Sequence, residues 1–382
     1  MALHAIILAG GSGTRLWPIS RAAVPKHLLP LGPGGVPLLR ATIDRLLPMG
    51  ATVHIVTVAS QARACQDVAT AAGLGPDSVI AEPMPRGTGP ALGMAVRWIA
   101  RSDADAVICS VHADHHVGDD DGYRAAIWAA AGWACSSGGL VTVGLTPTHP
   151  ATGFGYVALG RVHDPDDWAE PRGATESHAA LTEAASALAA FTAAGFVEKP
   201  PLHVAEGFVA DHSHLWNTGL FAWTAEAFLG ELRAAAPEVD DALVGVVEAR
   251  AAGAEEEVAR RYAALENVAI DPLVLEKTSR LTVVQAAFPW SDLGSWTDLL
   301  EARRAAGEED EGGNVVTGDG LAVDSRGCLV DARGGRLVTV VGAEDLVVVD
   351  TGDAVLVVPA DRAQAVRAAV EALRAAGRTE LL

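Results

Sequence analysis

The sequence predicts an α/β fold in which a mainly parallel sheet is covered by helices on both faces, followed by a small β-rich module. Short apolar strands alternate with helical segments up to about residue 145, and this alternation is typical of parallel sheets with two buried faces. After residue 313 the pattern changes to short strands separated by Gly or Asp pairs. The chain has 382 residues, half of them apolar, which is enough for two domains.

Residues 1–305 are expected to form the larger of the two domains. Its predicted strands are residues 5–8, 53–58, 79–81, 107–111, 140–144, 186–198 and 281–287. Its predicted helices are residues 38–47, 90–100 and 226–264, the last with a break at Pro237. Residues 161–190 are first polar and then alanine-rich, without a strong period, which predicts a surface excursion between two strands.

Residues 306–382 are expected to form a small C-terminal module. An acidic, Gly-containing linker at 305–313 leads into it. Strands within residues 314–358 recur at a spacing of about eight to twelve residues, which predicts a small all-β module or a short left-handed β-helix. Apolar positions near helical spacing predict a closing helix at residues 360–376.

A glycine-rich turn directly follows the first strand and carries two cations. Its residues are Leu8, Gly10, Gly11, Gly13 and Arg15, with Lys26 further along. Glycines let backbone N–H groups converge on phosphate oxygens without interference from Cβ atoms. A P-loop would end in Gly-Lys-Ser/Thr, and a dinucleotide fingerprint would have glycine in place of Leu16, so neither fits. The turn predicts a nucleoside triphosphate site, and the alternative is a plain strand-to-helix connection.

The charge of the chain limits the class of ligand. A net charge of −20 argues against a nucleic-acid or anionic-membrane surface. A small anionic substrate needs only a local positive pocket, which Arg15, Lys26, Arg86 and Lys199 could supply. The four cysteines follow no metal or disulfide spacing, and no apolar run approaches the ~18 residues of a membrane span. We therefore expect a cytoplasmic protein without a leader segment.

Two aspartates are candidate ligands for magnesium (Mg2+). Asp114 lies in Val-His-Ala-Asp-His directly after the strand at 107–111, and Asp292 lies in Trp-Ser-Asp-Leu-Gly-Ser-Trp. The phosphates of a nucleoside triphosphate repel one another, and a divalent cation offsets that repulsion. Magnesium accepts one or two protein carboxylates and keeps several waters. The structural alternatives are a turn-forming role for Asp114 and a helix cap for Asp292.

These motifs resemble the sugar nucleotidyltransferase family. The turn reads like Gly-Gly-x-Gly-x-Arg-Leu followed by Pro-Lys, and Trp17 to Arg21 is similar to the mannose-1-phosphate guanylyltransferase branch. The resemblance implies a Rossmann-like nucleotidyltransferase fold, a mixed sheet flanked by helices, with the C-terminal β module. It also implies that Arg15 and Lys26 are catalytic and that Asp114 and Asp292 share one magnesium ion. His112 takes the place of a proline in the family's Pro-x-Asp-His.

The resemblance also implies a sugar-phosphate site. Thr-Gly-Phe-Gly-Tyr carries Gly155, Phe-Val-Glu-Lys-Pro carries Glu198 and Lys199, and Trp-Asn-Thr-Gly-Leu-Phe carries Asn217. In the family, the acid and the amide bond sugar hydroxyls, and the lysine contacts the phosphate. Asp271, in Ile-Asp-Pro-Leu-Val-Leu-Glu-Lys, either assists this site or caps a helix with Pro272 at its first position.

The base site resembles the same branch with one departure, and a second departure lies beside the phosphate turn. Glu82, Arg86 and Thr88 match Glu-Pro-x-x-Arg-Asn-Thr, with Gly87 in place of the asparagine. Loss of that amide either blunts a preference for guanine or leaves it to the main chain. His27 stands where the family has glutamine, and a structural role is the favoured interpretation.

The implied activity is transfer of GMP from GTP to α-D-mannose 1-phosphate, which yields GDP-mannose and pyrophosphate. The alternatives are another hexose or heptose 1-phosphate, another nucleotide, or a non-catalytic nucleotide-sugar sensor. Exposed β edges in the C-terminal module predict a homodimer. No nucleic-acid or membrane partner is expected.

Overall fold

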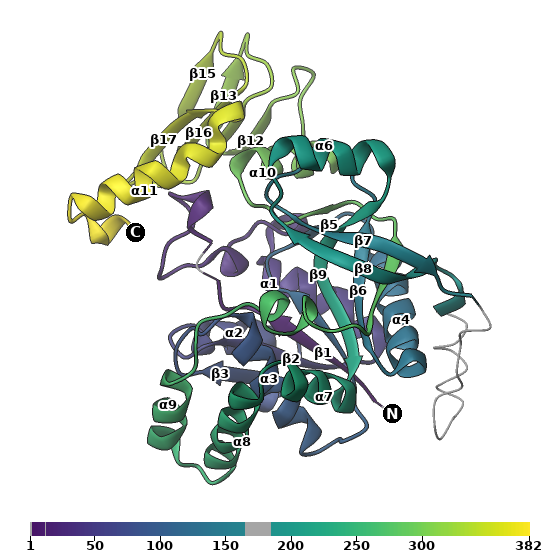
Figure 1. Ribbon diagram of the computed structural model, residues 1–382. Coiled ribbons are helices and arrows are strands. Elements are labelled where there is room, and N and C mark those ends of the chain that lie inside the picture. Colours follow the sequence, from purple (N-terminus) through teal and green to yellow (C-terminus); the bar gives the residue numbers. More distant parts are fainter. Residues whose placement is uncertain (1, 12, 165–184) are drawn as a thin grey trace. The chain divides into compact units, whose positions relative to one another are not determined.

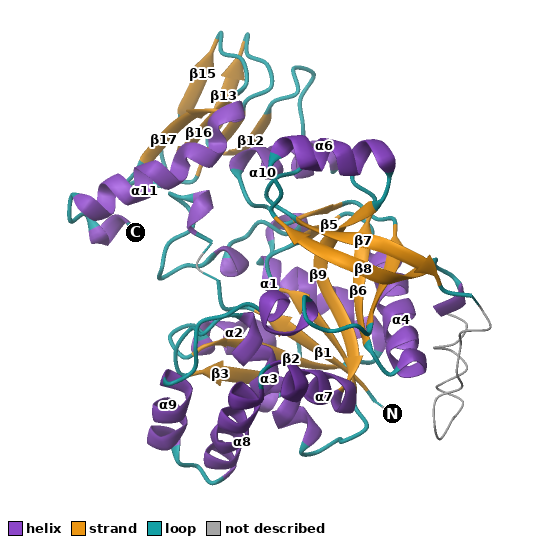
Figure 2. Cartoon of the chain, viewed as in Figure 1, coloured by secondary structure: helices purple, strands orange, loops and turns teal. Residues whose placement is uncertain are grey.

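The structure is a computed structural model that describes residues 2–11, 13–164 and 185–382 (Figure 1). The chain forms two compact units, each assembled from separate stretches. Unit 1 comprises Met1–Gly10, Thr42–His112 and Asp119–Phe288, and unit 2 comprises Gly11–Ala41, Ala113–Gly118 and Pro289–Leu382. Because these units interleave along the chain, the predicted division after residue 305 stays a prediction. Figure 2 distinguishes their helices and strands.

A nine-stranded sheet forms the centre of unit 1, in the order β3-β2-β1-β4-β9-β6-β10-β8-β7. Its strands are β1 (Leu3–Leu8), β2 (Thr52–Val58), β3 (Val79–Glu82), β4 (Val107–His112), β6 (Leu140–Leu145), β7 (Gly155–Val162), β8 (Ala190–Glu198), β9 (His214–Thr224) and β10 (Leu281–Ala286). β1 pairs in parallel with β2 and β4, and β6 pairs in parallel with β10. β9 lies antiparallel between β4 and β6. The sheet is therefore mixed, as the family resemblance implies, and not mainly parallel.

Helices cover both faces of this sheet. They are α2 (Ala62–Ala71), α3 (Thr88–Ala100), α4 (Asp120–Ser137), α6 (Leu202–Asp211), α7 (Ala225–Ala235), α8 (Pro237–Ala251) and α9 (Glu255–Ala263), while α1 (Leu38–Leu46) crosses from unit 2 into unit 1. Side chains alternate along a strand, so neighbours in β4 face opposite ways. Ile108 joins the large core that includes α3, α7 and α8, whereas Val107 packs with Ala131 of α4. Pro237 begins α8, which explains the break predicted there.

Unit 2 combines the glycine-rich turn with a stack of short strands that pair in parallel, except for the last, which pairs antiparallel with the strand before it. The strands are β12 (Val315–Gly318), β13 (Gly320–Val323), β14 (Leu329–Ala332), β15 (Val338–Val341), β16 (Leu346–Asp350) and β17 (Val355–Pro359). β12, β14 and β16 pair in parallel, as do β13 and β15. Each turn of the coil places an apolar residue above the last, so Val315, Leu329 and Val347 stack in one buried column.

Two helices and a small strand pair complete unit 2. These are α10 (Trp296–Ala305), α11 (Val366–Ala375), β5 (His116–Val117) and β11 (Trp290–Ser291). The core joins Leu16 and Trp17, which follow the glycine turn, to Trp296 of α10 and Val366 of α11. The glycine turn and the β-rich module therefore share one hydrophobic core.

The predicted fold class is confirmed, and most predicted elements appear within a few residues of their expected bounds. The closing helix begins later than expected, at Val366, because residues Ala360–Ala365 form a 3-10 turn. Most of the surface excursion predicted at 161–190 lies outside the described residues. No helix in the described stretches combines the length and apolar character that a membrane crossing needs.

Candidate active site

The candidate site residues fall into a phosphate group in unit 2 and two groups in unit 1. Gly11, Gly13, Arg15, Lys26, Asp114 and Asp292 belong to unit 2. Leu8, Gly10, Glu82, Arg86 and Thr88, and separately Gly155, Glu198, Lys199 and Asn217, belong to unit 1. Each group is built by its own local contacts.

The glycine turn is shaped to receive Lys26. Gly13 has φ 60°, in the left-handed region, and a Cβ atom there would overlap the Cβ of Lys26. Only glycine therefore fits without strain. The hydroxyl of Ser20 donates to the carbonyl of Gly13 at 2.5 Å, which fixes the turn. Leu16 and Trp17, buried behind the turn, anchor it in the core.

Lys26 joins the two segments that carry the candidate metal ligands. Its ammonium Nζ lies 2.7 Å from Oδ2 of Asp114 and donates to the backbone carbonyl of Asp292 at 2.5 Å. The lysine side chain is only 4% exposed, whereas that of Asp114 is 31% exposed and that of Asp292 is 21% exposed. A buried cation thus lies beneath two carboxylates that solvent can reach.

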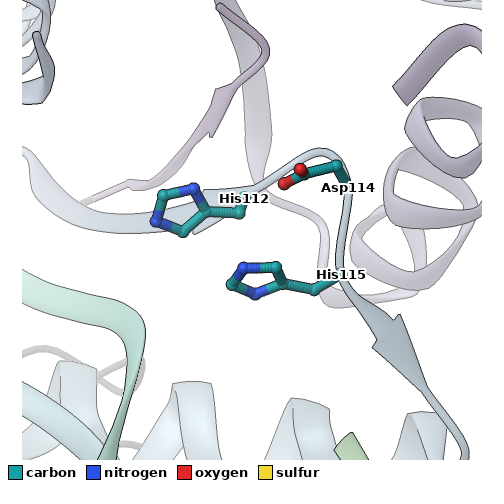
Figure 3. Close-up of side chains that lie close together, drawn as sticks. All are labelled: His112, Asp114 and His115. Carbon is teal, nitrogen blue, oxygen red and sulfur yellow. The ribbon is translucent and has the colours of Figure 1, made fainter. Parts of the chain in front are cut away.

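The pairing of β5 with β11 brings Asp114 and Asp292 to one place. His116 pairs with Ser291 in an antiparallel register, so the residues just beyond this pair, His115 and Asp292, emerge side by side. Asp114 is the next residue along the chain. Figure 3 shows His112, Asp114 and His115 at the end of β4, where one ligand atom of each lies within 4.8 Å of the others.

The two tryptophans around Asp292 hold its segment at both ends. The indole N–H of Trp290 donates to Nδ1 of His115 at 3.2 Å, and that of Trp296 donates to the carbonyl of Trp17 at 3.1 Å. Between them, Leu293 adopts φ 45°, an uncommon conformation for a bulky residue. Such strain persists where surrounding contacts impose it, often at functional sites.

The carboxylate of Asp292 is oriented by its own turn and by the glycine loop. Its Oδ1 accepts from the backbone N–H of Gly294 at 3.0 Å, and Oδ2 lies 3.7 Å from Nη2 of Arg15. Arg15 and Lys26 therefore each approach one of the two acids. Carboxylate oxygens are the donors that hard divalent cations prefer, so the chemistry of Asp114 and Asp292 fits such an ion.

His27 is a buried member of this group. It is 2% exposed, and burial lowers the pKa of His27 to about 4, against the opposing effect of the Asp114 charge. The imidazole is consequently neutral at physiological pH. This agrees with the structural role favoured from the sequence.

The residues expected at the base site lie in a tight arrangement of unit 1. Burial raises the pKa of Glu82 to about 7, and its carboxylate accepts a hydrogen bond from the hydroxyl of Tyr262. The guanidinium of Arg86 donates to the carbonyl of Ala263 at 2.5 Å. Thr88 accepts from the backbone N–H of Ile270 at 2.9 Å. Arg86 and Thr88 thus hold the end of α9 and the segment that follows it.

Gly87, where the related motif has asparagine, is required by the backbone. Its φ is 79°, and a Cβ atom there would overlap the carbonyl of Val268. The main chain of Val268 and Ala269 occupies the space beside Gly87 and Gly89. An asparagine side chain is excluded from this position by the neighbouring chain.

The candidate sugar residues gather where β7, β8 and β9 meet. Gly155 pairs with Glu198 across β7 and β8. Asn217 accepts from the hydroxyl of Thr142 at 2.9 Å and donates to Oδ1 of Asp271 at 3.3 Å. Burial and the charge of Glu198 raise the pKa of Asp271 to about 6. Gly155, Glu198, Asn217 and Asp271 therefore form one connected group.

Three features of the groups in unit 1 were left open or missed by sequence reasoning. Asp271 is not a helix cap: Ile270 holds the cap position of the turn Asp271–Leu275, which has no capping side chain. Lys199 forms an ion pair with Glu198 and adopts φ 48°, a strained conformation for lysine. Tyr262, the partner of Glu82, belongs to no short motif, so its role emerges only from the fold.

Comparison with known proteins identifies the family. A model of the nucleotidyl transferase family matches residues 4–309, and a model of the mannoseP isomerase/GMP-like beta-helix domain matches residues 318–373. The chain belongs to the nucleotidyl transferase family. It is an enzyme, a nucleotidyltransferase. Its C-terminal module belongs to the mannoseP isomerase/GMP-like beta-helix domain family. Nucleotidyltransferases of this family generally use a divalent metal.

Several named relatives of this nucleotidyltransferase match over nearly its full length. A mannose-1-phosphate guanylyltransferase from Escherichia coli K12 is 34% identical over 99% of this chain and 75% of its own. The xanthan biosynthesis protein XanB of Xanthomonas campestris is 35% identical over 98% of this chain and 74% of its own. A crystal structure of a mannose-1-phosphate geranyltransferase from Thermus thermophilus superposes with a TM-score of 0.78 at 33% identity, covering 98% of this chain and all of that one.

Proposed function

We propose that this nucleotidyltransferase transfers GMP from GTP to α-D-mannose 1-phosphate, giving GDP-mannose and pyrophosphate. Relatives named mannose-1-phosphate guanylyltransferase support the proposal, since they share about a third of their residues with almost the whole chain. The observation that carries it is the position of Lys26, whose ammonium contacts the Asp114 carboxylate and the Asp292 carbonyl beside the glycine turn. Two cations and two acids in one unit suit a triphosphate site.

The proposed reaction is a single in-line displacement. A phosphate oxygen of the sugar phosphate attacks the α-phosphorus of GTP, and the bond from that phosphorus to the oxygen bridging to the β-phosphate breaks. No covalent enzyme intermediate is needed, so this chain acts by positioning and by offsetting charge. Arg15 and Lys26 neutralise the triphosphate, and the backbone N–H groups around Gly11 and Gly13 bind its oxygens.

Magnesium is proposed as the divalent ion, held by Asp114 and Asp292. When bound, it supplies positive charge that offsets the repulsion between the two phosphates. Both carboxylates are partly exposed, and the ammonium of Lys26, which contacts the Asp114 carboxylate and the Asp292 carbonyl, supports a preference for positive charge at this place. That both acids share one ion stays part of the proposal.

The sugar phosphate is proposed to bind at the group formed by Gly155, Glu198, Asn217 and Asp271. The amide of Asn217 is held by Thr142 and Asp271, which orients it for a sugar hydroxyl. Glu198 accepts hydrogen bonds from hydroxyls, and Lys199 contacts the phosphate. Glu82, Arg86 and Thr88 are proposed to shape the base site, with main-chain groups replacing the amide that Gly87 lacks.

The test is an assay of pyrophosphate release from GTP and mannose 1-phosphate, with and without magnesium. A panel of triphosphates and sugar phosphates, including heptose 1-phosphates, defines both substrates. We expect the highest kcat/KM with the GTP and mannose 1-phosphate pair and no turnover without a divalent ion. A clear preference for another pair would reassign the substrates. Binding without turnover in magnesium would favour a nucleotide-sugar sensor.

Assembly and location are also proposed. Apolar side chains are exposed on the β-helix module, with Leu321 47%, Val341 65% and Val357 60% exposed. Burying such residues against a second copy is favourable, so we propose a homodimer. Light scattering on the purified protein measures this directly. We further propose that the enzyme acts in the cytoplasm, which fractionation of cells that express it would test.

A further inference from the structure

The pocket beside the glycine turn has a second wall that belongs to the last helix. This pocket of unit 2 has a volume of about 410 Å³. Gly11, Arg15 and Lys26 line it from the turn, and Arg367, Glu371 and Arg374 line it from α11. Sequence reasoning assigned no chemistry to α11.

The spacing of residues along α11 explains how the helix presents two arginines. Positions 367, 371 and 374 are separated by four and three residues, so they share one face of a helix. All three side chains are exposed. Val366 and Val370, on the neighbouring face, are buried in the core that also contains Leu16. The apolar face holds α11 in place while the charged face borders the pocket.

Contacts behind the pocket fix α11 to the glycine turn. Leu16, one residue after Arg15, shares its core with Val366 and Val370. The indole N–H of Trp17 donates to the carbonyl of Leu381 at 2.8 Å, which ties the residues after α11 to the same turn. The guanidiniums of α11 are therefore carried by a rigid element that is packed on the loop.

The charge of the pocket is opposite to that of the chain. Four cations line it, Arg15, Lys26, Arg367 and Arg374, against two acids, Asp114 and Glu371. The chain as a whole carries a net charge of −20. Among the described residues, the lining consists of charged groups and glycines with Leu293 and Val370 as its apolar members, and it contains no aromatic ring for a base. A compact polyanion suits such a pocket better than a nucleobase does.

We propose that Arg367 and Arg374 bind the β- and γ-phosphates of the nucleoside triphosphate and the pyrophosphate that leaves. This inference rests on the proposed function and deepens it. In the displacement described above, the leaving oxygen and its two phosphates gain negative charge as the bond to the α-phosphorus breaks. Arginine forms paired hydrogen bonds with phosphate oxygens, so α11 stabilises the leaving group while Lys26 and Arg15 act nearer the turn. The C-terminal helix is thus part of the phosphate site.

The test compares two double variants of the full-length protein. R367Q/R374Q removes both arginines of the pocket. R362Q/R378Q removes the same charge from exposed arginines flanking α11 that are not among the residues lining the pocket. Inorganic pyrophosphate is the probe, and its dissociation constant is measured by calorimetry together with its inhibition constant against GTP.

We expect R367Q/R374Q to weaken pyrophosphate binding about tenfold or more, because each guanidinium makes charge-assisted hydrogen bonds. The KM for GTP should rise with it, while the KM for the sugar phosphate stays within about twofold and R362Q/R378Q stays near wild type. The single variants R367Q and R374Q give intermediate losses, which serve as the measurement if the double variant melts early. Pyrophosphate binding equal to that of the control variant would overturn the proposal.

The outcomes also separate this inference from the proposed function. If the wild-type protein fails to turn over GTP and mannose 1-phosphate but loses pyrophosphate binding in R367Q/R374Q, the inference stands and the proposed substrates fail. If turnover is confirmed while both double variants bind pyrophosphate equally, the proposed function stands and the role of α11 is refuted.

Discussion

The ammonium of Lys26 lies 2.7 Å from the carboxylate of Asp114 and simultaneously donates to the backbone carbonyl of Asp292. One buried cation therefore connects the two segments that are expected to hold a metal ion. The β5–β11 pair, in which His116 faces Ser291, brings those segments together. The turn, the acids and the lysine form one electrostatic unit, and the following predictions test its parts.

Lys26→Ala should lower kcat by about a hundredfold or more, because a preorganised charge is lost where pyrophosphate leaves. The secondary structure should be retained, which circular dichroism checks alongside the pyrophosphate-release assay. Lys277→Ala provides the matched control, since Lys277 is exposed and belongs to unit 1. Turnover unchanged by Lys26→Ala would remove this lysine from the reaction.

Asp114→Asn and Asp292→Asn should each lower turnover by about a hundredfold or more, and chelation of divalent ions should abolish it. Added magnesium should restore part of the activity of each variant, because the remaining acid still binds the ion weakly. Titration of magnesium in the assay gives the apparent affinity. A variant whose magnesium dependence matches that of wild type would show that its acid does not contact the ion.

Gly13→Ala should destabilise the protein by about 1 to 3 kcal/mol, because φ 60° is unfavourable for alanine and its Cβ would overlap that of Lys26. Gly11→Ala is the control, since no heavy atom lies within 4 Å of a Cβ added there. Urea unfolding of both variants measures the difference. Equal stability of the two would mean that the turn rearranges easily.

Gly87→Asn restores the residue of the related motif and should nevertheless be harmful. The backbone at φ 79° and ψ 172° is almost exclusive to glycine, and a Cβ would meet the carbonyl of Val268. We expect a loss of about 1 to 3 kcal/mol in the free energy of unfolding. Selectivity between GTP and ATP, measured in parallel, should not improve. Increased GTP selectivity at unchanged stability would contradict this view.

Asp271→Asn should change the pH dependence of stability. The pKa of Asp271 is raised from 3.8 to about 6, so its ionisation destabilises the folded state. That cost grows as pH rises from about 4 to 6 and is fully present at pH 7, where it amounts to about 1 to 3 kcal/mol. The variant should therefore be more stable than wild type at pH 7.5 and equal at pH 3.5. Thermal unfolding at both values measures this, and an equal gain at both would exclude the ionisation as its cause.

Local motifs allowed part of this structure to be predicted. Short sequence patterns predicted the glycine turn, the strand before it and the two candidate aspartates. These features could be predicted because each depends on residues that are close together in the sequence. Gly13 is an example, because its positive φ is a local requirement of the turn. The family and the fold class inferred from these motifs are confirmed by the comparisons.

Features that depend on distant pairings could not be predicted in this way. The insertion of β9 between β4 and β6 makes the sheet mixed, although the strands up to residue 145 alternate as in a parallel sheet. The contact of Tyr262 with Glu82 and the position of Asp271 beside Asn217 arise only once separate segments fold together. The arginines of α11 lie in no motif, so their proximity to the turn became visible only in the folded chain.

The shared core of Leu16, Trp17 and the β-helix module has a practical consequence. An enzyme shortened after residue 305 would retain Arg15, Lys26, Asp114 and Asp292 but would lose Arg367 and Arg374 of α11. The truncation would also expose Leu16 and Trp17, which the β-helix module buries in the full-length chain. Such a fragment would expose apolar surface and aggregate, so the boundary between the two family matches is a poor truncation point.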